Sequence, residues 1–268
     1  MELRNRTAVV TGGSTGMGFA AAQELAAEGV RVALLARRED LLREKARQIG
    51  GIAVVCDVSS EESVEAALDT VERELGTPSI LVNSAGDGRM RNLVSPSGVP
   101  VDGDYIRDLL ATNVAGLLYM CRGFVVRLAR TEKDEGGLRG VIINVSSIGA
   151  MDGVMGSTYP ITKGAVNSAC LSLAREFSPW GIRVVTIAPG GIDTEMYRDG
   201  LTDGLEAMMK ASVPSLRRPG RPEEFGKLAL HICQNDYLNG TIVRLDGGLR
   251  CPFSGDVGGD VEAVAESL

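Results

Sequence analysis

The sequence predicts an α/β protein built on a single doubly wound parallel sheet with helices on both faces. Three observations lead to this prediction. Short apolar runs rich in β-branched residues alternate along the chain with longer helical patterns. The runs are apolar at nearly every position, which is typical of strands buried on both faces. Helical stretches connect them, and right-handed helical crossovers between parallel strands give a doubly wound sheet.

The expected elements follow one another in a regular order. Strands are expected at residues 7–12, 30–36, 51–57, 79–85, 140–146, 182–188 and 241–246. Helices are expected between the first six strands, at residues 17–28, 39–49, 60–75, 104–130 and 158–178. This order predicts a Rossmann-type sheet of about seven strands. No repeat or linker divides the chain, so residues 1–250 are predicted to form one domain.

Three segments break the regular pattern. Residues 87–103 form a long loop after the fourth expected strand. Residues 189–222 carry several Gly and Pro residues and predict a flap with one short helix, whose mobile part over the substrate is expected at residues 191–215. Residues 251–268 contain four acids and no base, which predicts a flexible C-terminal tail.

Composition and charge narrow the functional classes. The chain has 268 residues, of which 44% are hydrophobic and 24% charged, as is ordinary for a soluble enzyme with a sizeable core. A net charge of −7 argues against a general nucleic-acid binder, which needs basic patches. No run approaches the ~18–20 apolar residues of a membrane span. The N-terminus has no apolar signal-peptide segment, so we expect a cytoplasmic protein.

Cysteine and histidine usage predicts no metal site. None of the five cysteines forms a CxxC pair, and His231 is the only histidine. A zinc site needs closely spaced ligands of these types. Free thiols in a reducing cytoplasm are the simpler interpretation.

The first expected strand is followed at once by the glycine-rich turn TGGSTGMG, which opens a helix. Gly12, Gly16 and Gly18 would let the backbone turn sharply and approach a pyrophosphate, while the helix N-terminus supplies N–H groups and positive potential. Ser14, Thr15 and Met17, between these glycines, are also expected to contact the cofactor. The strand–turn–helix context favours a dinucleotide site over a simple tight connection.

The second expected strand ends in Arg37 and Arg38, where NAD-specific proteins usually place an acid for the ribose 2′-hydroxyl. A carboxylate would repel a 2′-phosphate, whereas a guanidinium can pair with it in a bidentate manner. The sequence therefore predicts NADP(H). The alternative is that both arginines are solvated residues at a helix start.

Tyr159 and Lys163 lie four residues apart in STYPITKGA. At this spacing they share one face of a helix, which places a phenol beside an ammonium group. A nearby positive charge favours the ionised phenol and would lower its pKa, so that Tyr159 could transfer a proton at neutral pH. A surface helix could carry the same pair without any function.

These motifs resemble those of the short-chain dehydrogenase/reductase superfamily over about residues 5–250. The resemblance rests on the glycine spacing, on NSAG at residues 83–86, and on Ser146 standing thirteen residues before Tyr159. Ser147 is the alternative to Ser146. LNGTIVRLDGGLR and DEGGLRGVIIN are most similar to the branch with 3-hydroxyacyl-CoA and hydroxysteroid dehydrogenases, which normally use NAD; Arg37 departs from that branch and matches NADP-dependent members.

The resemblance implies a role for each matching position. Ser146 would bind the substrate oxygen, Tyr159 would transfer the proton, Lys163 would bind the nicotinamide ribose, and Asn113 would position a water near Lys163. The further cofactor contacts it implies are Asp57, Val58, Asn83, Ala85, Gly86, Pro189, Gly190, Ile192 and Thr194. Members of the family are mostly homotetramers, and a dimer is the alternative.

Three functional hypotheses follow. The first is an NADPH-dependent reductase of a ketone, such as a carbonyl or acyl-thioester small molecule. The second is an NAD(P)-dependent 3-hydroxyacyl-CoA or hydroxysteroid dehydrogenase. The third is a non-catalytic dinucleotide-binding regulator, which a missing Tyr159 or Lys163 would have favoured.

Overall fold

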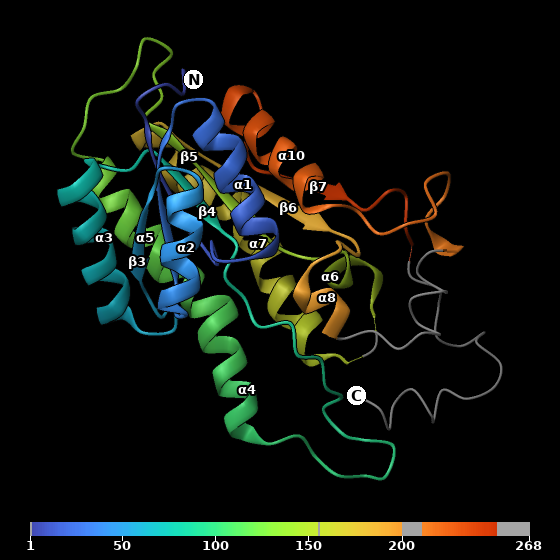
Figure 1. Ribbon diagram of the computed structural model, residues 1–268. Helices are drawn as coiled ribbons and strands as arrows, with labels where there is room; N and C mark the ends of the chain where they lie inside the picture. Colours follow the sequence, from blue (N-terminus) through green and yellow to red (C-terminus); the bar gives the residue numbers. More distant parts are fainter. Residues whose placement is uncertain (1, 155, 200–210, 251–268) are drawn as a thin grey trace.

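A computed structural model describes residues 2–154, 156–199 and 211–250 of the chain (Figure 1). The predicted C-terminal tail at residues 251–268 lies outside these residues, as does the stretch 200–210 in the predicted flap. The part of the flap that is described contains the short helix α8, Glu195–Asp199.

The described residues form one sheet of seven parallel strands in the order β3-β2-β1-β4-β5-β6-β7. The predicted doubly wound sheet is therefore confirmed. The order reverses between β1 and β4, so that the loops after these two strands separate and leave a crevice at their carboxyl ends. The strands are β1 Thr7–Thr11, β2 Arg31–Ala36, β3 Ile52–Val55, β4 Ile80–Asn83, β5 Gly140–Val145, β6 Ile182–Pro189 and β7 Thr241–Leu245.

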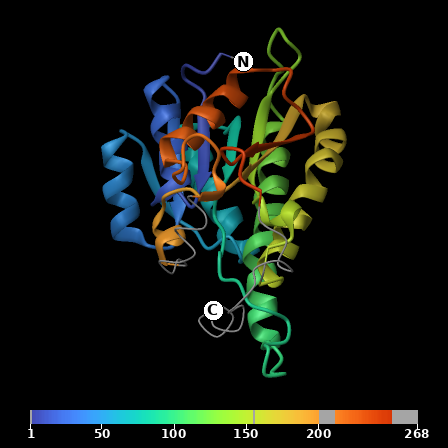
Figure 2. The ribbon, with the colours of Figure 1, turned by 90° about the vertical axis from the view of Figure 1, so that its right-hand side faces the viewer.

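Helices cover both faces of this sheet (Figures 1 and 2). One layer consists of α1, Gly16–Ala27, α2, Glu39–Gln48, and α10, Pro222–Gln234. The other consists of α3, Glu61–Leu75, α5, Gly116–Leu128, and α7, Thr158–Phe177. The remaining short elements are α4 Gly103–Leu110, the π-helical η1 Ala111–Ala115, α6 Gly149–Asp152 and the 3₁₀ turn η2 Ser178–Trp180.

Each strand contributes to two apolar cores because successive side chains point to opposite faces. Val9 packs toward α3, α5 and α7, whereas Ala8 and Val10 pack toward α1, α2 and α10. Leu34 and Leu35 divide in the same way on β2. Burial on both faces explains why the strands read as nearly continuous apolar runs.

The segment Gly103–Leu128 is one continuous helix made of α4, η1 and α5. Its length and mean hydropathy of 1.5 would by themselves allow it to cross a membrane. The sequence analysis expected no segment of this kind. Half of its most apolar window is buried inside the protein, and Met120 and Phe124 have no exposed surface. Core packing therefore accounts for much of its apolar character. The loop before it and α4 project away from the body of the protein (Figure 2).

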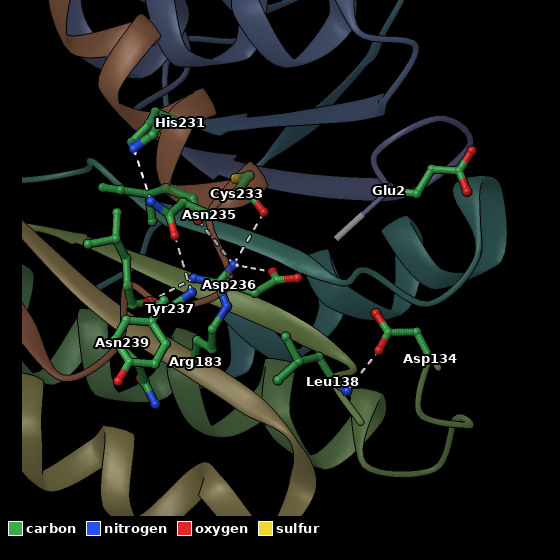
Figure 3. Close-up of polar contacts among 12 residues, drawn as sticks. Glu2, Asp134, Leu138, Arg183, His231, Cys233, Asn235, Asp236, Tyr237 and Asn239 are labelled. Atoms are coloured by element: carbon green, nitrogen blue, oxygen red, sulfur yellow. Dashed lines mark hydrogen bonds and ion pairs between the residues drawn. The ribbon is translucent and has the colours of Figure 1, made fainter. Parts of the chain in front are cut away.

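A buried arginine connects β6 to the end of α10. Arg183 donates to the carbonyl oxygens of Ile232 and Cys233, at 3.0 and 3.2 Å, and to that of Leu238 at 2.8 Å. It also pairs with Asp236 at 3.4 Å (Figure 3). Carbonyls at a helix C-terminus lack partners within the helix and carry negative partial charge. Arg183 therefore caps α10 and holds it against the sheet.

Candidate active site

A cavity of about 1060 Å³ lies along the carboxyl ends of β1 to β4, at the point where the strand order reverses. Open α/β sheets bind their ligands at this position. Most of the predicted cofactor contacts line it: Gly12, Ser14, Thr15, Gly16, Met17, Arg37, Arg38, Asp57, Val58, Ala85, Gly86 and Thr194. Residues distributed over half the sequence therefore converge on one groove.

The turn between β1 and α1 is shaped by its glycines. Gly12 and Gly16 have φ values of +64° and +55°, in the left-handed region that other residues rarely adopt. A Cβ at Gly18 would lie 2.5 Å from the carbonyl oxygen of Gly12, so a side chain there would collide with the backbone. No acid lies in the first turn of α1, and Thr15 makes no capping hydrogen bond within the described structure. The first N–H groups of α1 are thus suited to bind phosphate.

The two arginines after β2 differ in their surroundings. Arg38 lies 3.4 Å from Glu195 in an exposed ion pair, which joins this edge of the groove to α8. Arg37 has no ion-pair partner among the residues that the structure describes. A hydrogen bond from the Ser59 hydroxyl lowers the pKa of Asp57, and the charge of Arg37 contributes to the same shift. The groove therefore presents one unpaired guanidinium beside an ionised carboxylate.

The loop after β4 is held at the centre of the site. Thr11 accepts hydrogen bonds from the backbone N–H groups of Ser84 and Ala85, at 3.1 and 3.0 Å. A Cβ at Gly86 would lie 3.3 Å from Asn113 Oδ1 and 3.4 Å from Lys163 Nζ, so the backbone passes close to both polar groups. The sequence analysis did not single out Thr11, whose place at the end of β1 was the available signal.

Asn83 and Asn144 join the ends of β4 and β5. They are register partners in the two strands, and Asn83 Nδ2 donates to Asn144 Oδ1 at 3.0 Å. Both side chains are buried, with 4% and 0% of their surface exposed. Asn83 therefore supports the sheet below the groove and does not line it. Asn144 was missed, although a polar residue within an apolar strand is itself a signal.

Asn113 lies in η1, the π-helical turn between α4 and α5. Its Oδ1 accepts from the backbone N–H of Asp87 at 2.7 Å, and its Nδ2 donates to the Asp87 carbonyl at 2.9 Å and to Thr162 Oγ1 at 3.0 Å. Single π turns within α-helices are frequent at functional sites. Here the turn directs Asn113 inward, where it fastens the loop after β4 to the helix that carries Tyr159.

Tyr159 and Lys163 lie together near the beginning of α7, as predicted. Lys163 is 6% exposed, and its Nζ donates to the carbonyl of Val145 at 2.9 Å and lies 5.7 Å from the centre of the Tyr159 ring. Burial lowers the pKa of Lys163 to about 8. Burial also raises the pKa of Tyr159 to about 12, a rise that a hydrogen bond with Ser147 partly opposes.

The expected lowering of the Tyr159 pKa by Lys163 is therefore wrong for this structure. Loss of solvation disfavours the charged phenolate, and the Lys163 ammonium is directed at a backbone carbonyl. Tyr159 is consequently a protonated phenol at neutral pH. That state suits a proton donor.

The structure places the two serines after β5 the other way round from the prediction: Ser146 is buried and Ser147 is beside Tyr159. Ser146 is 3% exposed, and its hydroxyl donates to the carbonyl of Lys163 in α7 at 3.0 Å. This contact is buried between β5 and α7. Ser147 is partly exposed, lies close enough to the Tyr159 hydroxyl to oppose the rise in its pKa, and accepts from the Gly149 N–H at 3.1 Å. Neighbouring residues of an extended chain point to opposite sides, so only one of the two can face the site. The number of residues between a serine and Tyr159 gives their separation along the chain. It does not show to which side the serine side chain points.

The segment after β6 closes the far end of the site. Pro189 ends β6 and accepts from the Ile148 N–H at 3.0 Å, while the Gly190 N–H donates to Leu245 at 2.9 Å. Ile192 is buried beyond it. The Thr194 methyl carbon would lie 3.0 Å from a Cβ at Gly16, so this segment reaches back over the glycine turn. Of the predicted contacts in this segment, Thr194 lines the cavity, whereas Pro189, Gly190 and Ile192 do not.

Comparison with known proteins places this geometry in a family. The family model described as enoyl-(acyl carrier protein) reductase matches residues 12–250. The 3-hydroxyacyl-CoA dehydrogenase type-2 of Homo sapiens is 34% identical over 255 residues, which cover 93% of this chain and 97% of that protein. The 3-oxoacyl-[acyl-carrier-protein] reductase of Bos taurus is 32% identical over 249 residues, covering 92% and 98%.

Two solved structures are similar over the same extent. The 3-hydroxyacyl-CoA dehydrogenase type-2 of Mycobacterium avium has a TM-score of 0.86 at 30% identity and covers 92% of this chain and 97% of its own. The 3-ketoacyl-(acyl-carrier-protein) reductase of Brucella melitensis, complexed with NADH, has a TM-score of 0.82 at 28% identity, covering 92% and 98%. With this sheet, glycine turn and Tyr159–Lys163 pair, the chain belongs to the short-chain dehydrogenase/reductase superfamily of nicotinamide-dependent oxidoreductases.

Proposed function

We propose that the protein is an NADP(H)-dependent ketoreductase that reduces a ketone to a secondary alcohol. The observation that carries this proposal is the group of Ser147, Tyr159 and Lys163. It lies beside a dinucleotide-sized groove, because a Cβ at Gly86, which lines the groove, would be 3.4 Å from Lys163 Nζ. The Ser147 hydroxyl lies close to that of Tyr159, so both can reach one carbonyl oxygen, and Tyr159 is a protonated phenol. A merely nucleotide-binding protein would have no need of this arrangement.

Each residue has a defined task in the proposed reaction. A nicotinamide bound in the groove supplies the hydride for the carbonyl carbon. Tyr159 donates its proton to the carbonyl oxygen, and Ser147 donates a hydrogen bond to the same oxygen as negative charge develops there. Lys163, whose Nζ lies 5.7 Å from the centre of the phenol ring, would bind the nicotinamide ribose. Asn113 holds the loop after β4 so that Gly86 stays against Lys163.

The residues of the groove fit a phosphorylated dinucleotide, and Arg37 supports NADP(H) over NAD(H). Glycines open the turn for a pyrophosphate, and the N-terminus of α1 faces it. Arg37 lines the groove without an ion-pair partner among the described residues, so its guanidinium is available for a 2′-phosphate. Arg38 is less suited because Glu195 already pairs with it.

The substrate class is proposed as a 3-oxoacyl thioester or a related ketone. One group of relatives is named for the oxidation of 3-hydroxyacyl-CoA and another for the reduction of 3-oxoacyl thioesters, which are the two directions of one interconversion. The alternative function is therefore an NAD(P)-dependent 3-hydroxyacyl-CoA or hydroxysteroid dehydrogenase. The choice of NADPH favours reduction.

The test follows nicotinamide absorbance with NADPH or NADH against a panel of ketones and 3-oxoacyl thioesters. We expect turnover with NADPH, weaker turnover with NADH, and loss of turnover in Tyr159→Phe with unchanged NADPH affinity. Glu62→Gln, on the exposed start of α3, is the control. Equal use of NADH would refute the cofactor assignment, and undiminished turnover in Tyr159→Phe would refute the mechanism.

We also propose a homotetramer. Four large apolar side chains are exposed on the two helices α5 and α7: Leu118, Val126, Ile161 and Leu171, with 42%, 51%, 57% and 47% of their surface accessible. Such patches on neighbouring helices are typical of surfaces that bind another protein. Light scattering after gel filtration should give four chains per particle, and Ile161→Lys with Leu171→Lys should reduce that number.

A further inference from the structure

Helix α6 follows Ser147 closely in the chain and is only four residues long. It begins at Gly149 and is followed by Gly153, which has a φ of +69°. A helix of one turn does not hold its shape by its own hydrogen bonds. Yet the Gly149 N–H donates to the Ser147 hydroxyl at 3.1 Å, so the direction of that hydroxyl depends on the position of α6.

Arg244, on the edge strand β7, holds α6 from outside the groove. Its Nη1 and Nη2 donate to the two carboxylate oxygens of Asp152, at 2.6 and 2.8 Å. Its Nε donates to Asp246 at 2.6 Å, and Nη2 also donates to the Leu249 carbonyl at 3.1 Å. We call Arg244, Asp152, Asp246 and Leu249 the Arg244 cluster. One guanidinium thereby joins α6, β7 and the turn after β7.

This ion pair differs from the exposed pairs on the surface of the protein. The Asp152, Asp246 and Arg244 side chains are only 10%, 8% and 22% exposed. Bidentate, partly buried pairs of arginine and carboxylate are held in one geometry, whereas exposed pairs contribute little. Lysine could not replace Arg244, because a single ammonium cannot make these donations in three directions.

A small apolar cluster lies beside the Arg244 cluster and extends it to the flap. Ile148, which follows Ser147, packs with Val213 and Leu249, and all three are buried. A Cβ at Gly247 would lie 2.9 Å from Val213, so the turn after β7 fits closely against the end of the flap. The serine segment, the end of the flap and the turn after β7 are therefore packed against one another.

We infer that Arg244 and Asp152 are positioning residues of the reaction: they hold α6 so that Ser147 points at Tyr159, and they tie this serine to the flap segment at Val213. The inference rests on the proposed function. Neither residue lines the dinucleotide groove. Their loss should therefore impair the chemical step and leave cofactor binding intact.

The decisive experiment places Asp152→Asn in the wild-type protein and in Ser147→Ala. We expect kcat to fall by about tenfold to a hundredfold in the wild-type background, the size of effect that a misplaced catalytic group produces. In Ser147→Ala the same substitution should change kcat little, because the hydroxyl it positions is gone. The NADPH dissociation constant should stay constant throughout. Arg244→Lys should behave like Asp152→Asn.

Arg6→Gln serves as the matched control, because Arg6 and Asp134 form a partly buried pair at 3.5 Å in another part of the protein. It should leave kcat unchanged. An equal loss of kcat from Asp152→Asn in both backgrounds would indicate a general structural effect and would overturn the inference. Undiminished kcat in Asp152→Asn would overturn it as well.

Hydrogen exchange measured by mass spectrometry provides a second test that needs no substrate. Asp152→Asn should speed exchange in residues 147–153 and leave exchange in β1 and β4 unchanged. Unchanged exchange in residues 147–153 would overturn the inference. Absence of turnover in the wild-type protein would instead refute the proposed function, so the two failures are distinguishable.

Discussion

The adjacent residues Ser146 and Ser147 allow a sharp test of the site, because each can be replaced by alanine with the loss of one oxygen atom. The Ser147 hydroxyl lies close to that of Tyr159, whereas the Ser146 hydroxyl is buried and donates to the Lys163 carbonyl at 3.0 Å. The two substitutions should therefore affect different properties of the protein.

The expected magnitudes follow from these contacts. Ser147→Ala removes a donor to the oxygen on which charge develops, and the loss of such a donor lowers kcat by about a hundredfold to a thousandfold. Ser146→Ala removes one buried hydrogen bond to a backbone carbonyl, so the free energy of unfolding should fall by about 1 kcal/mol. Its kcat should stay near the wild-type value.

The assay combines steady-state kinetics on the best ketone of the panel with urea unfolding of both variants. NADPH binding, followed by fluorescence, shows whether each variant keeps its groove. If Ser146→Ala lost more activity than Ser147→Ala while both remained folded, the orientation argued here for the two hydroxyls would be refuted.

Three further predictions concern charge. Arg37→Ala should raise KM for NADPH by about tenfold to a hundredfold, since a hydrogen bond to a charged group contributes about 1.5–3 kcal/mol. KM for NADH should stay unchanged, and equal changes of KM for the two cofactors would contradict the prediction. Arg183→Met should lower the free energy of unfolding by about 3 kcal/mol in urea denaturation, because three carbonyls lose their donor. Arg122→Met, which removes an exposed ion pair, should change it much less. Burial lowers the pKa of Lys163 from 10.5 to about 8 in the folded protein. Between these two pH values the unfolded chain therefore binds more protons than the folded protein, so Lys163 makes the free energy of unfolding rise with pH. Unfolding measured from pH 8 to pH 10 should show that rise in the wild-type protein and not in Lys163→Met; an equal rise in both would assign it to other groups.

Much of the fold could be predicted because strands buried on both faces leave a strong signal. Runs such as TAVVT and GVIINV correspond to fully buried strands. Gly12 marks the turn after the first strand. The lengths of the helical stretches then indicated that helices connect the successive strands. The positions of the glycine turn and of the Tyr159–Lys163 pair were also predictable, because they depend on spacing within a single turn of chain, whereas the role of Arg37 in cofactor choice stays a prediction.

Features that depend on direction or on distant pairing could not be predicted. Whether Ser146 or Ser147 faces the groove depends on how β5 ends, and the π turn at Asn113 has no sequence signature in one chain. The contact of Arg244 with Asp152 joins residues that are far apart in sequence. The pKa of Tyr159 depends on how far the folded protein excludes water from it.

The π turn at η1 has a consequence for how the substrate side of this protein can vary. It adds one residue between α4 and α5, and one residue of helix corresponds to a rotation of about 100°. Tyr105, on α4, bonds the Arg89 carbonyl and Thr158 only in the present rotation, whereas α5 stays embedded in the core. Deleting one residue from Ala111–Ala115 would turn α4 and its loop away from Tyr159 and leave the sheet intact. The turn thus sets the rotation of α4 relative to α5, and with it the position of the loop that carries Arg89.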